Sequence, residues 1–154
     1  DVLLRPPRDP SEAIVTRAEL RRVGIESGTI TAGAMAAYVA GILRYGPGPA
    51  ASTMAFMAHT SAQILHALAC RSPYRTLLAA RQLPRNPYIS LAVGGSALAQ
   101  VSCLLFPGMR AFLGLTPIRL ADLAVVSAGA VLPLAVNELT KPAAPSNLLP
   151  KPGS

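Results

Sequence analysis

Residues 53–69 read TMAFMAHTSAQILHALA, an uncharged stretch almost long enough to cross a membrane. It nevertheless carries both histidines of the chain, His59 and His66, with Gln63 between them. Spacings of four and three residues place these three side chains on one face if the stretch is helical. The stretch therefore predicts an apolar helix with one polar stripe, and the rest of the chain must explain that stripe.

The composition is typical of a membrane protein. Hydrophobic residues make up 51% of the 154 residues and charged residues only 14%, where about a quarter is usual. The mean hydropathy is +0.42. The length predicts one domain. The chain begins at Asp1 and not at Met, and we expect it to be a fragment or a processed piece.

Four apolar stretches are each close to the roughly 20 residues that cross a bilayer as a helix. They are residues 23–43, 50–70, 88–106 and 120–137. We predict an all-α fold, an integral membrane bundle of four transmembrane helices with short loops. A soluble four-helix bundle is the alternative, but the second and third stretches lack the charged face that it requires.

Two terminal segments flank this predicted four-span domain of residues 23–141. Residues 1–22 read as a cytoplasmic loop and helix start, in which Asp9 can cap a helix that has Pro10 at its first position. Residues 142–154 are rich in Pro, and we expect a disordered tail.

The basic residues predict the topology. With four spans, both termini and the central loop share one side of the membrane. That side would hold eleven basic residues: Arg5, Arg8, Arg17, Arg21, Arg22, Arg71, Arg75, Arg81, Arg85, Lys141 and Lys151. The other side would hold three: Arg44, Arg110 and Arg119. This bias predicts that both termini are cytoplasmic. The net charge of +7 then reflects topology and not nucleic-acid binding, for which no motif is present.

Small residues in the first span predict close helix packing. They form two rows at four-residue spacing, one of Gly24, Gly28, Ala32 and Ala36, the other of Gly33, Ala37 and Gly41. The two cysteines, Cys70 and Cys103, would lie near opposite membrane faces, too far apart for a disulfide.

Three acidic residues lie in or near the predicted spans. Each has a basic residue three or four positions away, so we expect pairs at helix ends or at the surface and not cation ligands. The expected pairs are Glu26 with Arg22, Asp122 with Arg119, and Glu138 with Lys141.

Several stretches together resemble a known family. DVLLRPPRDPSEAIVTR (residues 1–17), TMAF (53–56) followed by CRS (70–72), and LTPIRLADLAVV (115–126) with LPLAVNELTK (132–141) occur in order. They are similar to the last four spans of P-type cation-transporting ATPases of the calcium and sodium/potassium type. The resemblance covers about residues 1–141. It implies that the chain is the C-terminal membrane region of an ATP-driven pump.

The resemblance also implies partners and a site. The partners would be the lipid bilayer, the transported cation, and the remaining six spans and cytoplasmic domains of the pump. ATP and Mg²⁺ would belong to the parent, because this chain lacks the phosphorylated Asp-Lys-Thr-Gly-Thr motif. No catalytic residue or cofactor is expected in the chain itself. In the family, the eighth span contributes a Glu or Gln to a cation site, and that position falls on Gln63.

His66 falls where the family often has Asn, so Gln63 and His66 are the candidate cation-lining residues. A Gln carbonyl suits a hard cation such as Ca²⁺, and Gln at this position fits calcium pumps of the plasma-membrane kind. The alternative for Gln63, His59 and His66 is interhelical hydrogen bonding. The alternative for the whole chain is a non-enzymatic four-span assembly or regulatory subunit.

Overall fold

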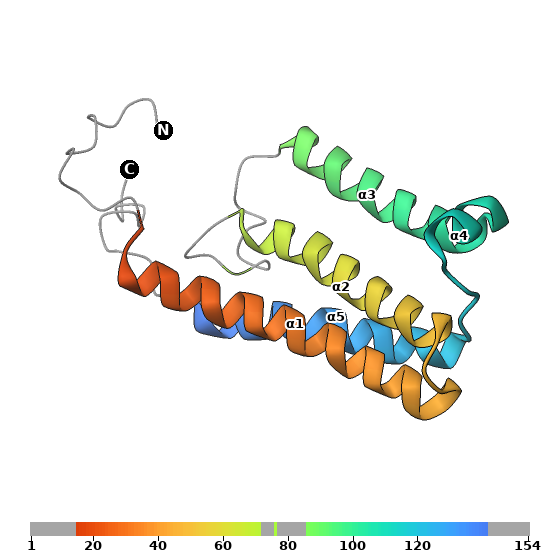
Figure 1. Ribbon diagram of the computed structural model, residues 1–154. Helices are drawn as coiled ribbons and strands as arrows, with labels where there is room; N and C mark the ends of the chain where they lie inside the picture. The colour runs from red at the N-terminus through yellow and green to blue at the C-terminus, as the bar shows by residue number, and fades with distance from the viewer. Residues whose placement is uncertain (1–14, 72–75, 77–85, 142–154) are drawn as a thin grey trace.

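The computed structural model describes residues 15–71, 76 and 86–141, which form five α-helices (Figure 1). The helices are α1 (Arg17–Tyr45), α2 (Pro49–Ala69), α3 (Pro87–Leu105), α4 (Pro107–Leu113) and α5 (Leu120–Thr140). The all-α prediction is confirmed. The four long helices lie close to the four predicted stretches, but α1 is longer at both ends. The predicted helix start at Asp9 and the predicted tail of residues 142–154 lie outside the described residues.

Local sequence signals explain where the long helices begin. The Thr16 hydroxyl accepts the Glu19 amide at 3.2 Å, while the Glu19 carboxylate accepts the Thr16 amide at 2.6 Å, so α1 starts with a reciprocal cap. The Asn86 side chain accepts the amide of Tyr88 at 3.0 Å at the start of α3. Both α2 and α3 have Pro in the first turn, where the missing amide hydrogen costs nothing.

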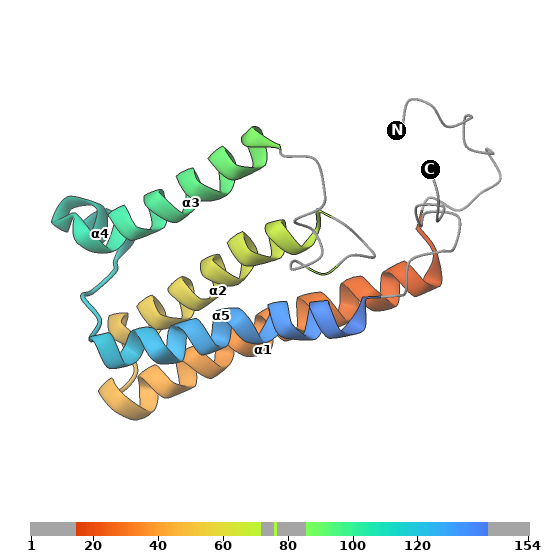
Figure 2. The same cartoon turned by 180° about the vertical axis from the view of Figure 1, so that it is seen from behind.

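Three helices, α1, α2 and α5, each pack against the other two and form the body of the molecule (Figures 1 and 2). Their core holds mainly small and flexible side chains: Ala37, Met54, Met57, Ala58 and Val126. The backbones of α1 and α5 meet at Gly33 and Gly129. A Cβ atom added to Gly129 would lie 2.7 Å from the Gly33 carbonyl oxygen. Only glycine therefore allows this approach.

The two predicted small-residue rows have different environments. Gly33, Ala37 and Gly41 are buried in α1, as expected for a packing face. The other row, Gly24, Gly28, Ala32 and Ala36, is exposed, and nothing lies within 4 Å of a Cβ added to Gly24 or Gly28. Among the described residues, only one of the two predicted packing rows is therefore used.

The helix α3 stands to one side of this body and contacts α2 and α4 (Figure 1). None of its residues is buried. Its main polar contact with α2 is Gln100, whose Nε2 donates to the Ser61 hydroxyl at 2.7 Å and to the Met57 carbonyl at 3.1 Å. The connection after α3 contains a short helix that was not predicted, because Pro107 starts α4 and Gly114, with φ of +66°, ends it.

Two of the described helices, α3 and α5, are long and apolar enough to cross a membrane. The four-span prediction is thus supported in part. The helices α1 and α2 are also long, 29 and 21 residues. Their Gly, Ala, Ser and Thr content and the charges at the start of α1 lower their hydropathy. These small residues are the ones that let the three helices pack closely.

Candidate functional site

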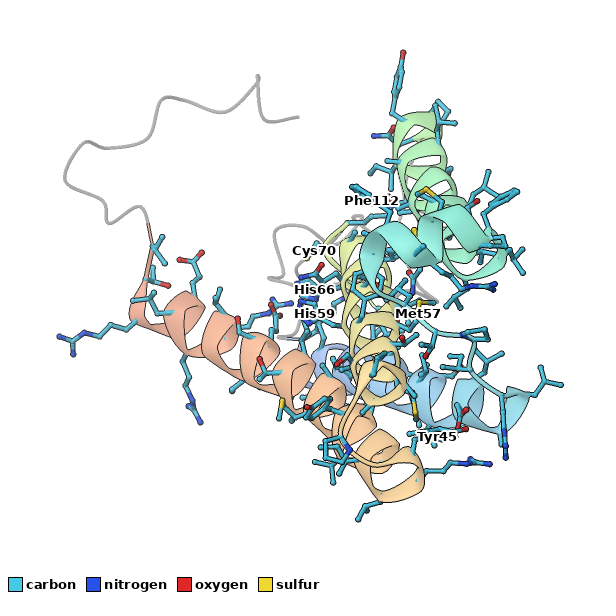
Figure 3. All side chains as sticks on the ribbon, turned by 45° about the vertical axis from the view of Figure 1, so that its right-hand side comes forward. Tyr45, Met57, His59, His66, Cys70 and Phe112 are labelled. Atoms are coloured by element: carbon cyan, nitrogen blue, oxygen red, sulfur yellow. The ribbon has the colours of Figure 1, made fainter. Side chains whose placement is uncertain are left out.

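The polar stripe of α2 forms two separate local pairs. The Nε2 atom of Gln63 lies 3.0 Å from the Nε2 atom of His59. Seven positions further along the helix, the Cys70 Sγ atom lies 3.3 Å from the His66 Nε2 atom. Figure 3 shows His59, His66 and Cys70 along the side of α2 that faces α1. The predicted common face is therefore present, but Gln63 and His66 have different partners.

His66 reaches across to α1. Its Nε2 atom lies 3.6 Å from the Oε2 atom of Glu26. The other carboxylate oxygen of Glu26 accepts from Arg22 Nε at 2.8 Å and from Asn137 Nδ2 of α5 at 2.6 Å. The predicted Glu26–Arg22 pair is confirmed. We call the group of Arg22, Glu26, His66 and Asn137 the three-helix junction.

Asn137 was not predicted as a site residue. It is 2% exposed, and its Oδ1 atom is buried without a hydrogen-bond partner among the described residues. A sequence signal does exist, because Asn137 lies four and eight residues after the buried Pro133 and Gly129, on the same helical face.

Lys141 closes the same end of the body. Its Nζ atom donates to the Ala69 carbonyl at the end of α2 at 3.1 Å and pairs with Glu138 Oε1 at 2.6 Å. The predicted Glu138–Lys141 pair is confirmed. A lysine on the last carbonyls of a helix satisfies acceptors that the helix itself leaves open.

The opposite end of the body is closed by Asp122. Its carboxylate is fully buried, accepts the Tyr45 hydroxyl at 2.6 Å and the Arg119 amide at 2.7 Å, and lies 3.0 Å from Arg44 Nη1. The hydrogen bond to Asp122 raises the pKa of Tyr45. The predicted helix-end contact between Asp122 and Arg119 is present, but the backbone amide of Arg119 makes it. The side-chain ion pair of Asp122 is with Arg44, and the carboxylate is buried and not at the surface.

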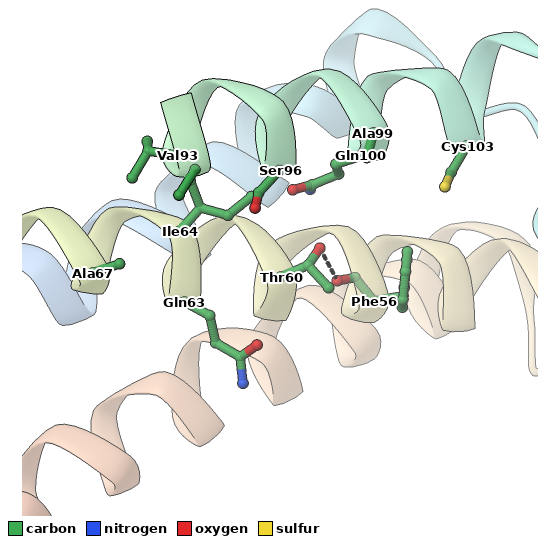
Figure 4. Close-up of a pocket in the computed structure, with 11 residues that line it drawn as sticks. Phe56, Thr60, Gln63, Ile64, Ala67, Val93, Ser96, Ala99, Gln100 and Cys103 are labelled. Atoms are coloured by element: carbon green, nitrogen blue, oxygen red, sulfur yellow. Dashed lines mark hydrogen bonds between the residues drawn. The ribbon is translucent and has the colours of Figure 1, made fainter. Parts of the chain in front are cut away.

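A groove of about 510 Å³ lies between α2 and α3. It is bordered by Phe56, Thr60, Gln63, Ile64, Ala67, Ala92, Val93, Ser96, Ala99, Gln100 and Cys103. The Gln63 amide points away from α3, toward the side of α1, whereas Ile64 points at α3 (Figure 4). Gln63 thus borders the groove while its polar end lies on the other face of α2. Cys70 and Cys103 are both free thiols.

The sequence matches the model of a known protein family. Residues 1–143 match the family model described as the cation-transporting ATPase C-terminus. The chain belongs to this family. A direct comparison with proteins of curated function gives no match. As the C-terminal region of a P-type cation-transporting ATPase, the chain is part of a membrane protein, and it implies the rest of the pump around it.

In this ATPase region, the described helices do not complete a cation site by themselves. No group of three His, Cys, Asp or Glu side chains among residues 15–71, 76 and 86–141 could hold a metal ion. Gln63 is exposed, and its side chain contacts His59.

Proposed function

We propose that this ATPase region is the last part of the membrane domain of an ATP-driven Ca²⁺ pump, and that Gln63 lines its cation site. The observation that supports the proposal best is the placement of Gln63. Gln63 is a neutral polar side chain on an uncharged helix, and it is exposed. Its amide is directed to the α1 side of α2 (Figure 4). Polar side chains within membrane-spanning segments are often functional.

The chemistry of the Gln63 amide supports the same role. Its Nε2 atom is the one that contacts His59, so its carbonyl Oε1 atom is left to face a ligand. Ca²⁺ takes six to eight oxygen ligands, and amide carbonyls are among them. A Gln supplies one such oxygen without adding a buried charge. ATP and Mg²⁺ would act in other parts of the pump.

His66 does not share this role in our proposal. It was a candidate for the cation site together with Gln63, but its ring nitrogen lies beside Glu26 and Cys70. The carboxylate of Glu26 in turn accepts from Arg22 and Asn137. The negative charge beside His66 is therefore already paired with the Arg22 guanidinium. We therefore place only Gln63 at the cation.

The test is Gln63→Ala in the intact pump. We expect the Ca²⁺ concentration for half-maximal ATPase activity to rise about tenfold or more, because one oxygen ligand is lost, while expression is unchanged. Thr60→Val is the matched control, because the Thr60 hydroxyl is used by the Phe56 carbonyl of its own helix at 2.8 Å. Identical Ca²⁺-activation curves for wild type and Gln63→Ala would refute the role of Gln63.

A further inference from the structure

The three-helix junction carries an inference beyond the cation ligand itself. Its members come from all three helices of the body: Arg22 and Glu26 from α1, His66 from α2 and Asn137 from α5. The Glu26 side chain is only 14% exposed. Such a network can determine how three helices are positioned, because few other strong contacts compete with it inside a membrane.

The contacts orient the Glu26 carboxylate in one direction. Arg22 and Asn137 both donate to its Oε1 atom. This leaves the Oε2 atom directed at His66, 3.6 Å away. Asn137 is thus linked to α2 through Glu26 and His66.

Asn137 would be a poor choice for packing alone. Its Oδ1 atom is buried without a hydrogen-bond partner in the described part of the chain. An unpartnered buried acceptor is destabilising, whereas an apolar side chain of similar volume avoids that cost. The useful contribution of the residue is therefore the hydrogen bond that its Nδ2 atom donates to Glu26.

We propose that Asn137 and Glu26 are positioning residues that hold, through His66, the cation-lining turn of α2. Gln63 lies one turn before His66, on the neighbouring position of the same helix face. Loss of the junction would let this turn rotate or shift, and the Gln63 carbonyl would leave its place at the cation. The proposal rests on the proposed role of Gln63.

The experiment measures Ca²⁺-activated ATPase activity of the full-length pump. Asn137→Leu removes the donor at similar volume, and we expect the half-activating Ca²⁺ concentration to rise about threefold to tenfold, as for loss of one or two hydrogen bonds. The maximal rate should stay within about twofold of wild type. Thr140→Val is the control on the same helix, because Thr140 is exposed and bonds only carbonyls of α5.

A pair of variants at Glu26 tests the same link independently of the folding of Asn137→Leu. Glu26→Leu removes both acceptor oxygens and should weaken Ca²⁺ activation as much as Asn137→Leu. Glu26→Gln keeps one oxygen for Asn137 and should restore most of the lost affinity. A Glu26→Gln pump as weak as Glu26→Leu would overturn the proposal.

Combination with Gln63→Ala separates this proposal from the one before. If the junction acts through Gln63, Asn137→Leu should add little in the Gln63→Ala background. An equal further loss there would overturn the positioning role, as would a lower maximal rate with unchanged Ca²⁺ affinity. If Gln63→Ala shifts the affinity and Asn137→Leu does not, the junction proposal fails alone. If Gln63→Ala has no effect, the cation role of Gln63 fails instead.

Discussion

At the scale of single residues, two glycines decide how the body packs. Gly33 and Gly129 bring the backbones of α1 and α5 together, and a Cβ on either would meet the carbonyl of the other helix. Gly28 and Gly94 are also glycines, but nothing lies within 4 Å of a Cβ added to either. The difference lies in the neighbour and not in the residue type.

We predict that Gly129→Ala destabilises the chain by about 1–3 kcal/mol, since overpacking a close contact forces the helices apart. Gly28→Ala should be neutral or stabilising by up to about 1 kcal/mol, because Ala favours the helix. Thermal unfolding of the detergent-solubilised protein measures both. Equal melting temperatures for the two variants would contradict the backbone contact.

The residues that sequence reasoning identified and those that it missed follow a pattern. Glu26–Arg22 and Glu138–Lys141 were predictable because both partners lie within one helical turn. The links from Asn137 to Glu26 and from Tyr45 to Asp122 were not, because they join residues 111 and 77 positions apart. No local spacing indicates such pairs. The same limit prevented a choice between the two small-residue rows of α1.

At the scale of elements, α3 differs from the other long helices. The approximate positions of all four long helices could be predicted from apolar runs bounded by Pro and Gly, although α1 extends beyond its predicted range at both ends. Their association could not, because α3 is apolar enough to cross a membrane yet buries none of its residues here. Its apolar surface suits lipid or other spans of the pump, and Gln100 is its main polar link to α2.

We predict that Gln100→Leu loosens α3 without unfolding the body. Spin labels on Ile64→Cys and native Cys103, with Cys70→Ser, would report the α2–α3 distance across the groove. The distance distribution should broaden, because the bonds to Ser61 and to the Met57 carbonyl are lost. Ser90→Ala is the control, since Ser90 bonds only the start of its own helix. An unchanged distribution would mean that apolar contacts alone hold α3.

At the scale of the whole molecule, the basic residues carry the prediction of orientation. The three arginines expected on the outer side each have a partner among the described residues. Arg44 pairs with Asp122, Arg110 donates to the Leu104 carbonyl at 2.7 Å, and Arg119 lies 5.9 Å from the centre of the Tyr45 ring.

We predict that the turn between α1 and α2 and the loop between α2 and α3 lie on opposite sides of the membrane. Single-cysteine variants Pro47→Cys and Thr76→Cys, each with Cys70→Ser and Cys103→Ser, would be treated with a membrane-impermeant thiol reagent on intact cells. Pro47→Cys should be labelled and Thr76→Cys should react only after permeabilisation. The reverse pattern would refute the assigned orientation.

The contact between Gly33 and Gly129 has a mechanical consequence. Two helices that touch backbone to backbone cannot slide past each other by changing rotamers, as side-chain layers can. We therefore expect α1 and α5 to move together as one rigid body. Across the groove between α2 and α3, by contrast, Gly94 and Gly95 have nothing within 4 Å of an added Cβ. We therefore expect a displacement within the described helices to open or close this groove before it separates α1 from α5.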